Sequence, residues 1–378
     1  PFLSETNVSG VYPPLGLAYL AAAARDAGHP VSVIDAYAND LTRQEQLDAV
    51  LRVRPDVVGL TCTTFDWPLV ADLARRVRRM RPSIRIWIGG PQLSLFPDEC
   101  MAETAVDLAV VGEGDETLVR LLDRVDRGEE LAGVAGTIVR DGDELVHGPA
   151  GSPIEALDSL PLPALDLLPL SRYRSLDLPA PFASMVTSRG CPFRCRYCSQ
   201  VYVGGRYRAH GVERVLDEMT RASERFGARE IVFFDETFTL EREWVLQLCE
   251  GILQRGLLVP WNVRTRIDRL DADVVGAMAE AGCCSVHVGI ETGSPRVQKL
   301  MNKNLRLDGV ARALQAARDA GLETRGYFML GYPGETPEEM EQTIQLSLDL
   351  PLDWASFTLT IALPGTEIRA DRQALHAA

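Results

Sequence analysis

Three cysteines lie close together near the middle of the chain, in the stretch SRGCPFRCRYCSQ at 188–200. Cys191, Cys195 and Cys198 have the spacing Cys-x3-Cys-x2-Cys. A structural zinc site takes four Cys or His ligands, usually as two separated pairs, and no second pair is evident in the sequence. Thiolates also hold iron–sulfur clusters, and a cubane cluster offers four irons. Three cysteines on one loop would bind three irons and leave the fourth open to a ligand that is not protein.

The predicted elements around this loop favour a reactive cluster over a chance group of cysteines or a zinc site completed by a distant residue. Apolar strands separated by helical stretches are predicted at 184–190, 229–236, 259–266, 284–291, 323–330 and 354–362. Gly190 and Pro192 give a tight turn directly after the first of these strands. Six such units are two short of a closed eight-stranded barrel, and barrels of this kind gather their chemistry at the carboxyl ends of the strands.

With Tyr197 before the last cysteine, the loop resembles the signature of the radical SAM superfamily, Cys-x3-Cys-x-aromatic-Cys. The resemblance implies a [4Fe-4S] cluster whose open iron chelates the amino and carboxylate groups of S-adenosylmethionine (SAM). It also implies reductive cleavage of SAM to methionine and a 5′-deoxyadenosyl radical, which abstracts hydrogen from an unactivated C–H bond. An external electron donor of the flavodoxin or ferredoxin type is implied as a partner.

Two later strands supply candidate SAM contacts. In WNVRTR (261–266) and CSVHVGIE (284–291) polar residues alternate, so that they share one face of each strand. An inward Arg264 or Arg266 would hold the SAM carboxylate through paired hydrogen bonds. The stretches VGIETGSPRVQKLMNKN and AGLETRGYFMLGYPGETPEE resemble the same superfamily, in the branch that carries B12-binding domains, and by that resemblance Glu291 is expected to contact SAM.

The predicted catalytic residues are Tyr202, Tyr207, Asp235, Glu236 and His287. Asp235 and Glu236, in FFDET, lie at a strand end and would receive the methionine ammonium or the substrate. A phenol with an ordinary pKa near 10, such as that of Tyr202 or Tyr207, can donate a proton or a hydrogen bond. Each of these residues also has an ordinary alternative role. Asp235 and Glu236 could be strand-end acids that are solvated or paired in salt bridges, and the tyrosines could belong to a packing loop. His287 could be a hydrogen-bonded packing residue.

The first part of the chain also alternates strands and helices. Strands are predicted at 29–35, 54–61, 84–90 and 107–114, and helices at 15–28, 69–80 and 115–125. Apolar strands separated by helices indicate a parallel sheet that is covered on both faces and binds ligands at the carboxyl ends of its strands. A further strand is expected before Pro13 but is not visible, and the chain starts at Pro1, so a longer N-terminus is expected.

Four blocks of this part resemble the B12-binding domain that precedes many radical SAM enzymes: PPLGLAYLAAAARDAG, PDVVGLTCTT, IWIGGP and VVGEGDET. The resemblance implies cobalamin at the strand ends, where glycines let a ligand approach the backbone closely. The predicted cofactor contacts there are Thr61, Thr63, Gly89, Gly90, Gly112 and Glu113.

One position departs from the B12-binding pattern. Many B12 proteins carry Asp-x-His-x-x-Gly, whose His ligates cobalt, but this chain has Tyr37 at the His position of the motif that starts at Asp35, and Asp40 at the Gly position. No histidine is therefore placed to ligate cobalt from below. Either cobalamin binds without a protein ligand, or the domain is a retained scaffold without cobalamin.

The predicted fold is α/β: a doubly wound, Rossmann-like (flavodoxin-like) parallel sheet over 1–145 and a partial (β/α)6 radical SAM barrel over 184–378. Residues 146–183 are rich in Pro and Leu and are predicted to be a linker that packs between the two domains.

Composition limits the partners. The 378 residues are 46% hydrophobic and 24% charged, and the net charge of −14 argues against a nucleic-acid partner, which normally meets a basic face. No apolar run reaches the roughly 18 residues of a membrane span, and no signal peptide is evident. The scattered remaining cysteines favour a reducing cytoplasm.

Two functions remain open from the sequence. The first is cobalamin-dependent C-methylation of a small-molecule substrate, a natural product in a setting such as antibiotic biosynthesis. The alternative is a cobalamin-free radical dehydration, epimerisation or redox step on a sugar-like or aminoglycoside-like substrate. A non-catalytic cobalamin or SAM sensor is disfavoured by the intact cysteine triplet.

Overall fold

A computed structural model of the chain describes residues 10–199 and 205–370. The chain divides into two compact units, one that runs to Leu178 and one that starts at Pro179. Every helix in the described ranges is too short or too polar to cross a membrane.

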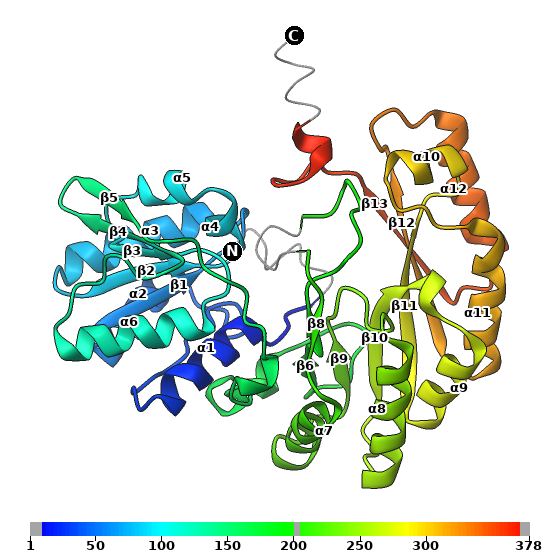
Figure 1. Cartoon of the computed structure of the whole chain (residues 1–378), viewed down its shortest axis with the longest axis horizontal. Helices are drawn as coiled ribbons and strands as arrows, with labels where there is room; N and C mark the ends of the chain where they lie inside the picture. Colours follow the sequence, from blue (N-terminus) through cyan, green and yellow to red (C-terminus); the bar gives the residue numbers. More distant parts are fainter. Residues whose placement is uncertain (1–9, 200–204, 371–378) are drawn as a thin grey trace. The chain divides into compact units, whose positions relative to one another are not determined.

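The sheet of the first unit has five strands in the order β1-β2-β3-β4-β5 (Figure 1). Its strands are β1 (Val57–Thr61), β2 (Arg85–Gly89), β3 (Leu108–Val110), β4 (Thr137–Asp141) and β5 (Glu144–His147). The first three are parallel, as predicted, whereas β4 and β5 form an antiparallel hairpin at one edge. This hairpin was not predicted, although its two-residue turn, Gly142 and Asp143, is a hairpin signal.

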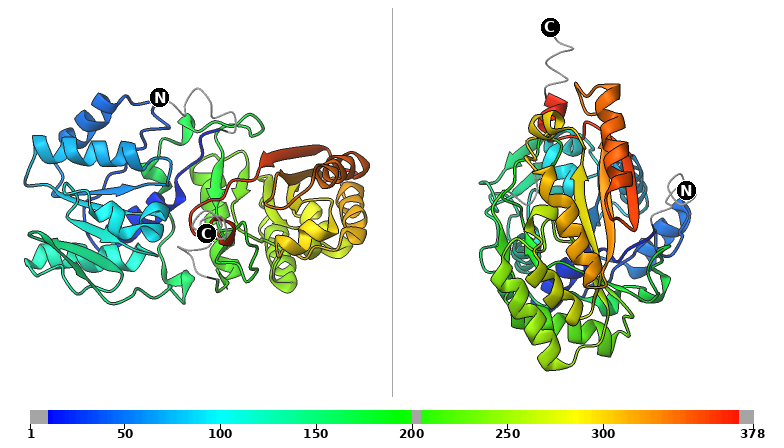
Figure 2. Two further views of the ribbon diagram at one scale, coloured as in Figure 1. Left: turned by 90° about the horizontal axis from the view of Figure 1, so that it is seen from above. Right: turned by 90° about the vertical axis from the view of Figure 1, so that its right-hand side faces the viewer.

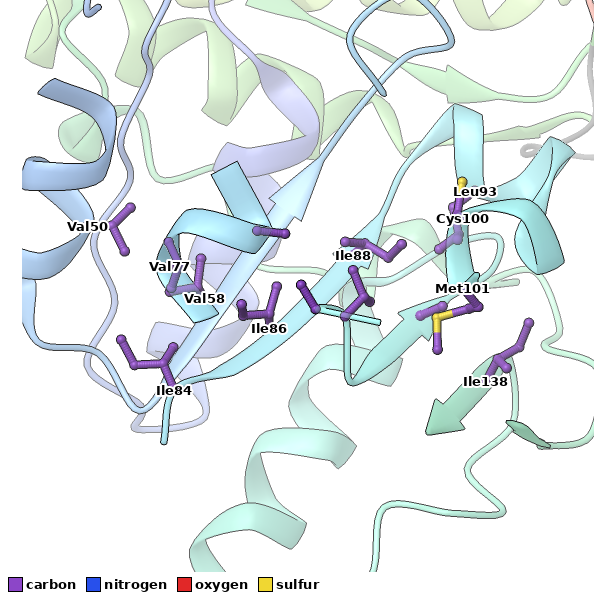
Figure 3. Close-up of a cluster of buried hydrophobic side chains, with 14 of the residues drawn as sticks. Val50, Val58, Val77, Ile84, Ile86, Ile88, Leu93, Cys100, Met101 and Ile138 are labelled. Carbon is purple, nitrogen blue, oxygen red and sulfur yellow. The ribbon is translucent and has the colours of Figure 1, made fainter. Parts of the chain in front are cut away.

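Helices cover both faces of this sheet, which confirms the Rossmann-like prediction. They are α1 (Leu15–Asp26), α2 (Arg43–Val53), α3 (Trp67–Met80), α4 (Pro91–Leu95), α5 (Pro97–Met101) and α6 (Asp115–Arg127). On one face Ile86 and Ile88 of β2 share a buried cluster with Val50 of α2 and Val77 of α3 (Figure 3). Between them in sequence, Trp87 packs on the other face with residues of α6 such as Leu121.

The strand predicted at 29–35 is wrong, because these residues join no sheet. Pro30 has no N–H to donate to a ladder. Val31 and Val33 instead pack against the buried Ala21 and Ala22 of α1, so their apolar alternation reflects burial against a helix.

The Pro-rich segment packs on the first unit up to Leu178. It contains three short 3-10 turns, Leu157–Ser159, Leu165–Leu167 and Leu170–Arg172. Ala164 N donates to the carbonyl of Ala18 at 3.0 Å, and the buried Tyr173 hydroxyl donates to Asp35 at 2.8 Å. A linker role for the whole of 146–183 stays a prediction.

The second unit contains six parallel strands in the order β13-β12-β11-β10-β9-β6, each overlapping a predicted strand. They are β6 (Ala183–Met185), β9 (Ile231–Phe233), β10 (Trp261–Arg266), β11 (Cys283–Glu291), β12 (Glu323–Leu330) and β13 (Trp354–Leu359). In the described residues β6 and β13 are the two edges of this sheet, so the barrel is open. The predicted six-unit partial barrel is confirmed.

Helices follow the strands along the chain and cover one face of this sheet (Figures 1 and 2). They are α7 (Val212–Thr220), α8 (Arg242–Arg255), α9 (Ala272–Glu280), α10 (Pro295–Leu300), α11 (Val310–Asp319) and α12 (Pro337–Asp349). The covered face is apolar: Phe233 and Trp261 pack edge to face at 5.8 Å, and Trp244 of α8 joins them through Phe238. Polar side chains such as Arg264 therefore lie on the opposite face.

Candidate functional site

The three cysteines lie on the loop that leaves the end of the first strand of the open barrel. A short strand, β7 (Ser188–Arg189), pairs antiparallel with β8 (Arg208–Ala209) and encloses the loop. Gly190, with a φ of +86°, turns the chain into it. All eight cysteines of the chain are reduced; of the three on the loop, Cys191 is buried, Cys195 is half-buried and Cys198 is exposed. The thiols thus run from the protein interior to the surface.

Asp235, just after β9, holds the start of this loop. It is buried, and its carboxylate accepts hydrogen bonds from Thr187 N at 3.0 and 3.1 Å, from Thr187 Oγ1 at 2.7 Å and from Ser188 Oγ at 2.5 Å. Burial raises the pKa of Asp235, and the hydrogen bonds from Ser188 and Thr187 offset part of that rise. This environment supports a positioning role, and a direct catalytic role stays a prediction.

Further groups lie beside Asp235. Thr237 Oγ1 is 3.8 Å from Cys191 Sγ. Burial and then the charge of Asp235 raise the pKa of Tyr207. The pKa of Glu236 is also raised, first by the protein atoms around it and then by the charge of Asp235. The Glu236 side chain nevertheless reaches solvent. A carboxyl group with a raised pKa keeps its proton to a higher pH than an ordinary one, and Glu236 does so beside the cysteine loop.

Arg266, at the end of β10, places a positive charge on the cysteine loop. Its Nη1 is 3.9 Å from Cys195 Sγ, and its guanidinium lies 4.0 Å from the centre of the Phe193 ring. Nε and Nη2 donate to the two oxygens of Asp268, each at 2.9 Å. Burial raises the pKa of Asp268, but Arg266, together with Arg269 and a backbone hydrogen bond, outweighs burial, so the pKa of Asp268 is lowered. A fixed guanidinium at this position would balance part of the negative charge of a metal-bound thiolate.

Arg266 was predicted to hold SAM, but its hydrogen bonds are directed to Asp268, to the Lys303 carbonyl and to Cys195. The structure therefore places it as a neighbour of the cysteines, and a SAM contact stays a prediction.

Glu291 ends β11 in a conformation that few non-glycine residues adopt. The register against β12 skips a residue between Gly289 and Glu291, which is a β-bulge, and the φ of Glu291 is +72°. The Glu291 carboxylate pairs with Lys303 Nζ at 2.8 Å. A Cβ added to Gly289 would lie 2.4 Å from Glu291 Oε1 and 2.8 Å from Lys303 Nζ. The ion pair between Glu291 and Lys303 therefore lies close against the backbone of β11 at Gly289.

Tyr197 connects the cysteine loop to this ion pair. Its hydroxyl is 3.4 Å from Lys303 Nζ, and its ring packs with the buried Met301. Burial, followed by the charge of Glu291, raises the pKa of Tyr197. Asn302 Nδ2 also donates to the carbonyl of Arg194 at 2.6 Å. The segment after α10 thus holds the loop at several points.

A row of basic side chains crosses the polar face of the open barrel. Arg264, His287 and Arg325 are register neighbours on three adjacent strands. The Arg264 guanidinium lies 4.1 Å from the centre of the Phe234 ring, and His287 Nδ1 is 2.9 Å from Tyr327 Oη. The bond to Tyr327 fits the packing role for His287, and its catalytic role stays a prediction.

The structure brings Tyr207, Asp235 and Glu236 together at the start of the cysteine loop, whereas His287 lies within the sheet. Tyr202 lies outside the described residues. Lys303, Asp268 and Thr187 were not predicted; neither the sequence spacing nor the alternation of polar residues identifies them as site residues.

In the first unit, Gly89 ends β2 and Gly90 lies against β1. Gly90 has a φ of +99°, and a Cβ there would lie 2.6 Å from Thr61 Oγ1. Thr61 and Thr63 are exposed at the same carboxyl edge. The cofactor contacts expected at Thr61, Thr63, Gly89 and Gly90 stay a prediction.

Gly112 and Glu113 follow β3. Gly112 N donates to Ser94 Oγ at 3.2 Å, and Glu113 Oε2 accepts from Ile154 N at 2.7 Å. Glu113 therefore holds the segment after the hairpin, and its predicted cofactor contact stays a prediction.

Tyr37, at the position where B12 proteins carry a cobalt-ligating histidine, is bound to an acid. Its backbone N–H donates to Asp35 Oδ1 at 3.0 Å, and its hydroxyl donates to Asp66 Oδ1 at 2.6 Å. Thr63 Oγ1 donates to the other oxygen of Asp66 at 2.6 Å. Burial and Asp66 raise the pKa of Tyr37, which disfavours a phenolate ligand. These residues are compatible with bound cobalamin only if Tyr37 does not ligate the cobalt.

In the part of the chain that the structure describes, no three Cys, His, Asp or Glu side chains surround a point where a metal ion could bind. A cluster of several irons has a different requirement, because each thiolate binds its own iron and the sulfur atoms need not meet at one point. The cysteine loop fits the second case better than a zinc site.

Sequence comparison identifies both units. A model described as the Radical SAM superfamily matches residues 185–347, and one described as a B12 binding domain matches residues 6–122. An uncharacterised methyltransferase of Pyrococcus horikoshii is 36% identical over 94% of this chain and 77% of its own length. An anaerobic magnesium-protoporphyrin IX monomethyl ester cyclase of Rubrivivax gelatinosus is 28% identical, over 96% of this chain and 66% of its own length.

Solved structures share the fold. The methyltransferase TsrM from Kitasatospora setae, solved with cobalamin and a [4Fe-4S] cluster, superposes with a TM-score of 0.82 at 21% identity, over 97% of this chain and 73% of that chain. The cobalamin-dependent enzyme OxsB gives 0.84 at 19% identity, over 98% of this chain and 59% of that chain. The chain belongs to the radical SAM superfamily, in the branch that carries an N-terminal B12-binding domain.

Proposed function

We propose that this protein is a cobalamin-dependent radical SAM methyltransferase that acts on a carbon atom of a small molecule. The observation that carries the proposal is the loop of three cysteines at the carboxyl end of a parallel sheet, beside Arg266 and in a chain with a B12-binding domain. The 36% identity to a methyltransferase supports methylation over the cobalamin-free alternative.

Cys191, Cys195 and Cys198 would hold the cluster, and Glu291 would contact SAM. When bound, the cluster and SAM supply a 5′-deoxyadenosyl radical that removes hydrogen from carbon, and cobalamin supplies the methyl group. The chain's own task is to position these groups.

Asp235 and Arg266 carry out most of that positioning. Asp235 fixes the residues that lead into the loop, because four hydrogen bonds converge on its buried carboxylate. Arg266 balances negative charge on the thiolates, since its guanidinium is 3.9 Å from Cys195 Sγ and is itself oriented by Asp268.

The corrin would lie at the carboxyl edge of the first sheet. Gly90 supports this placement, because a side chain there would collide with Thr61 and occupy the space beside the strand ends. Tyr37 supports binding without a ligand from below, because its hydroxyl is already bound to Asp66.

The substrate would be a polar small molecule that meets the polar face of the open barrel, where His287 and Tyr327 are hydrogen-bonded at 2.9 Å. Glu236 or Tyr207 would exchange a proton with it. An external one-electron donor would reduce the cluster.

The test is anaerobic reconstitution of the protein with iron, sulfide and cobalamin. The protein should retain corrinoid, seen by absorption and by mass spectrometry, and should convert SAM with a reductant to S-adenosylhomocysteine and 5′-deoxyadenosine. Cluster-dependent SAM cleavage without any retained corrinoid would contradict methylation and favour the radical dehydration or epimerisation alternative.

A further inference from the structure

Lysine is almost absent from this chain. Of 39 Lys and Arg residues, only Lys299 and Lys303 are lysines. Lys299 is exposed on α10, whereas Lys303 is 6% exposed. A buried ammonium group is costly unless it is paired, so its surroundings indicate what it does.

Lys303 contacts both Glu291, at the end of β11, and the residues of and beside the cysteine loop. Its Nζ pairs with Glu291 Oε1 at 2.8 Å and lies 3.4 Å from the Tyr197 hydroxyl. Its backbone carbonyl accepts from Arg266 Nη2 at 3.1 Å. One residue thus joins the end of β11, the residue before the last cysteine, and the arginine beside Cys195.

The space around Lys303 Nζ is restricted on the side of β11. A Cβ at Gly289 would lie 2.8 Å from Nζ, so the backbone of β11 passes directly beside the ammonium group. The planar guanidinium of arginine is larger and presents its donors in a fixed fork. A compact charge on a flexible stem is needed at this position.

We infer that Lys303 is the positioning residue that orients the Glu291 carboxylate toward SAM and ties it to the cysteine loop. The inference rests on the proposed function, because it requires SAM to bind beside Glu291. Without the ammonium group, the half-buried Glu291 carboxylate loses its charged partner and its fixed direction.

The test compares Lys303→Met with Lys299→Met in the full-length, anaerobically reconstituted protein. Lys303→Met should keep its iron content but bind SAM about tenfold more weakly, since the loss of one charge-assisted hydrogen bond has about that effect. Lys299→Met should bind SAM as the wild type does. Lys303→Arg should not restore binding.

A double-mutant cycle keeps the test valid if Lys303→Met folds poorly. In a Glu291→Gln background the carboxylate is replaced by an uncharged amide, so removal of Lys303 should weaken SAM binding much less than it does in the wild type. Equal losses in both backgrounds would overturn a role through Glu291, and so would wild-type affinity in Lys303→Met.

The two lysines also give a readout independent of activity. In protein labelled with 13C-lysine, the Lys303 side-chain signal should shift when SAM is added, and the Lys299 signal should not. If wild-type protein binds neither cluster nor SAM, the proposed function fails. If it binds both and the Lys303 signal does not respond, only this inference fails.

Discussion

The carboxyl edges of the two sheets differ in what they present to a ligand. At the first sheet, Gly90 lies close against Thr61, and Thr61 and Thr63 are exposed. At the second, buried or half-buried charges such as Arg266 and Lys303 are fixed by partners within 3 Å. The first edge suits a large ligand held by shape, and the second suits charged groups that must be oriented before they react.

The largest effect is expected at the cysteine loop. Cys195→Ala removes one of three iron ligands beside Arg266, so iron–sulfur absorption and SAM cleavage should both be lost. Iron analysis and anaerobic assay measure the two. Cys249→Ala, on α8, removes a buried cysteine outside the loop and should keep both. Full iron content in Cys195→Ala would show that the cluster assignment is wrong.

Asp235→Asn should have the next largest effect, a loss of stability. Its amide would turn a donor toward Thr187 or Ser188, so buried donors would lose their acceptor, at a cost of about 2–3 kcal/mol in free energy of unfolding. Urea unfolding measures this. Asp273→Asn, whose side chain is 80% exposed beside Arg242, should cost less than about 1 kcal/mol. Equal losses of free energy of unfolding in the two variants would contradict the positioning role of Asp235.

Gly90→Ala tests the edge of the first sheet. The added Cβ meets Thr61 Oγ1, and residue 90 has a positive φ that alanine rarely adopts. The substitution should therefore lower the free energy of unfolding by about 1–2 kcal/mol and reduce corrinoid retention. Gly133, with a φ of +80°, has nothing within 4 Å of an added Cβ, so Gly133→Ala carries only the backbone strain. If both variants retain corrinoid equally, this edge is not the binding site.

The charged second unit should also be acid-sensitive. Hydrogen bonds from Arg296, followed by Thr336 and Ser294, lower the pKa of Glu339 from 4.5 to about 2. Because the folded-state pKa is depressed, this contribution to stability is present above pH 4.5 and is lost as pH falls toward 2. In urea unfolding at several pH values, Glu339→Gln should flatten this part of the profile; an unchanged slope would contradict the assignment.

The smallest effect is expected at Tyr37. Tyr37→Phe removes one partly exposed hydrogen bond to Asp66, which contributes about 0.5–1 kcal/mol. Corrinoid retention should not change, because the phenol is not expected to ligate cobalt. Loss of corrinoid in this variant would show that Tyr37 contacts the cofactor directly.

Features that depend on neighbouring residues could be predicted from the sequence, whereas features that depend on distant contacts could not. Short-range patterns sufficed for the strands of the open barrel and for the cysteine loop after the first of them. Alternation misled at Val31 and Val33, because burial against a helix produces the same pattern as a strand. Lys303 and Thr187 were missed because their roles depend on contacts across many residues of sequence, which spacing does not encode.

Mössbauer spectroscopy of 57Fe-reconstituted protein, recorded with and without SAM, tests the central claim most directly. We expect a four-iron cluster in which one iron changes its spectrum when SAM is added, because Cys191, Cys195 and Cys198 leave that iron without a protein ligand. Zinc in place of iron, or a cluster whose four irons are all indifferent to SAM, would contradict it.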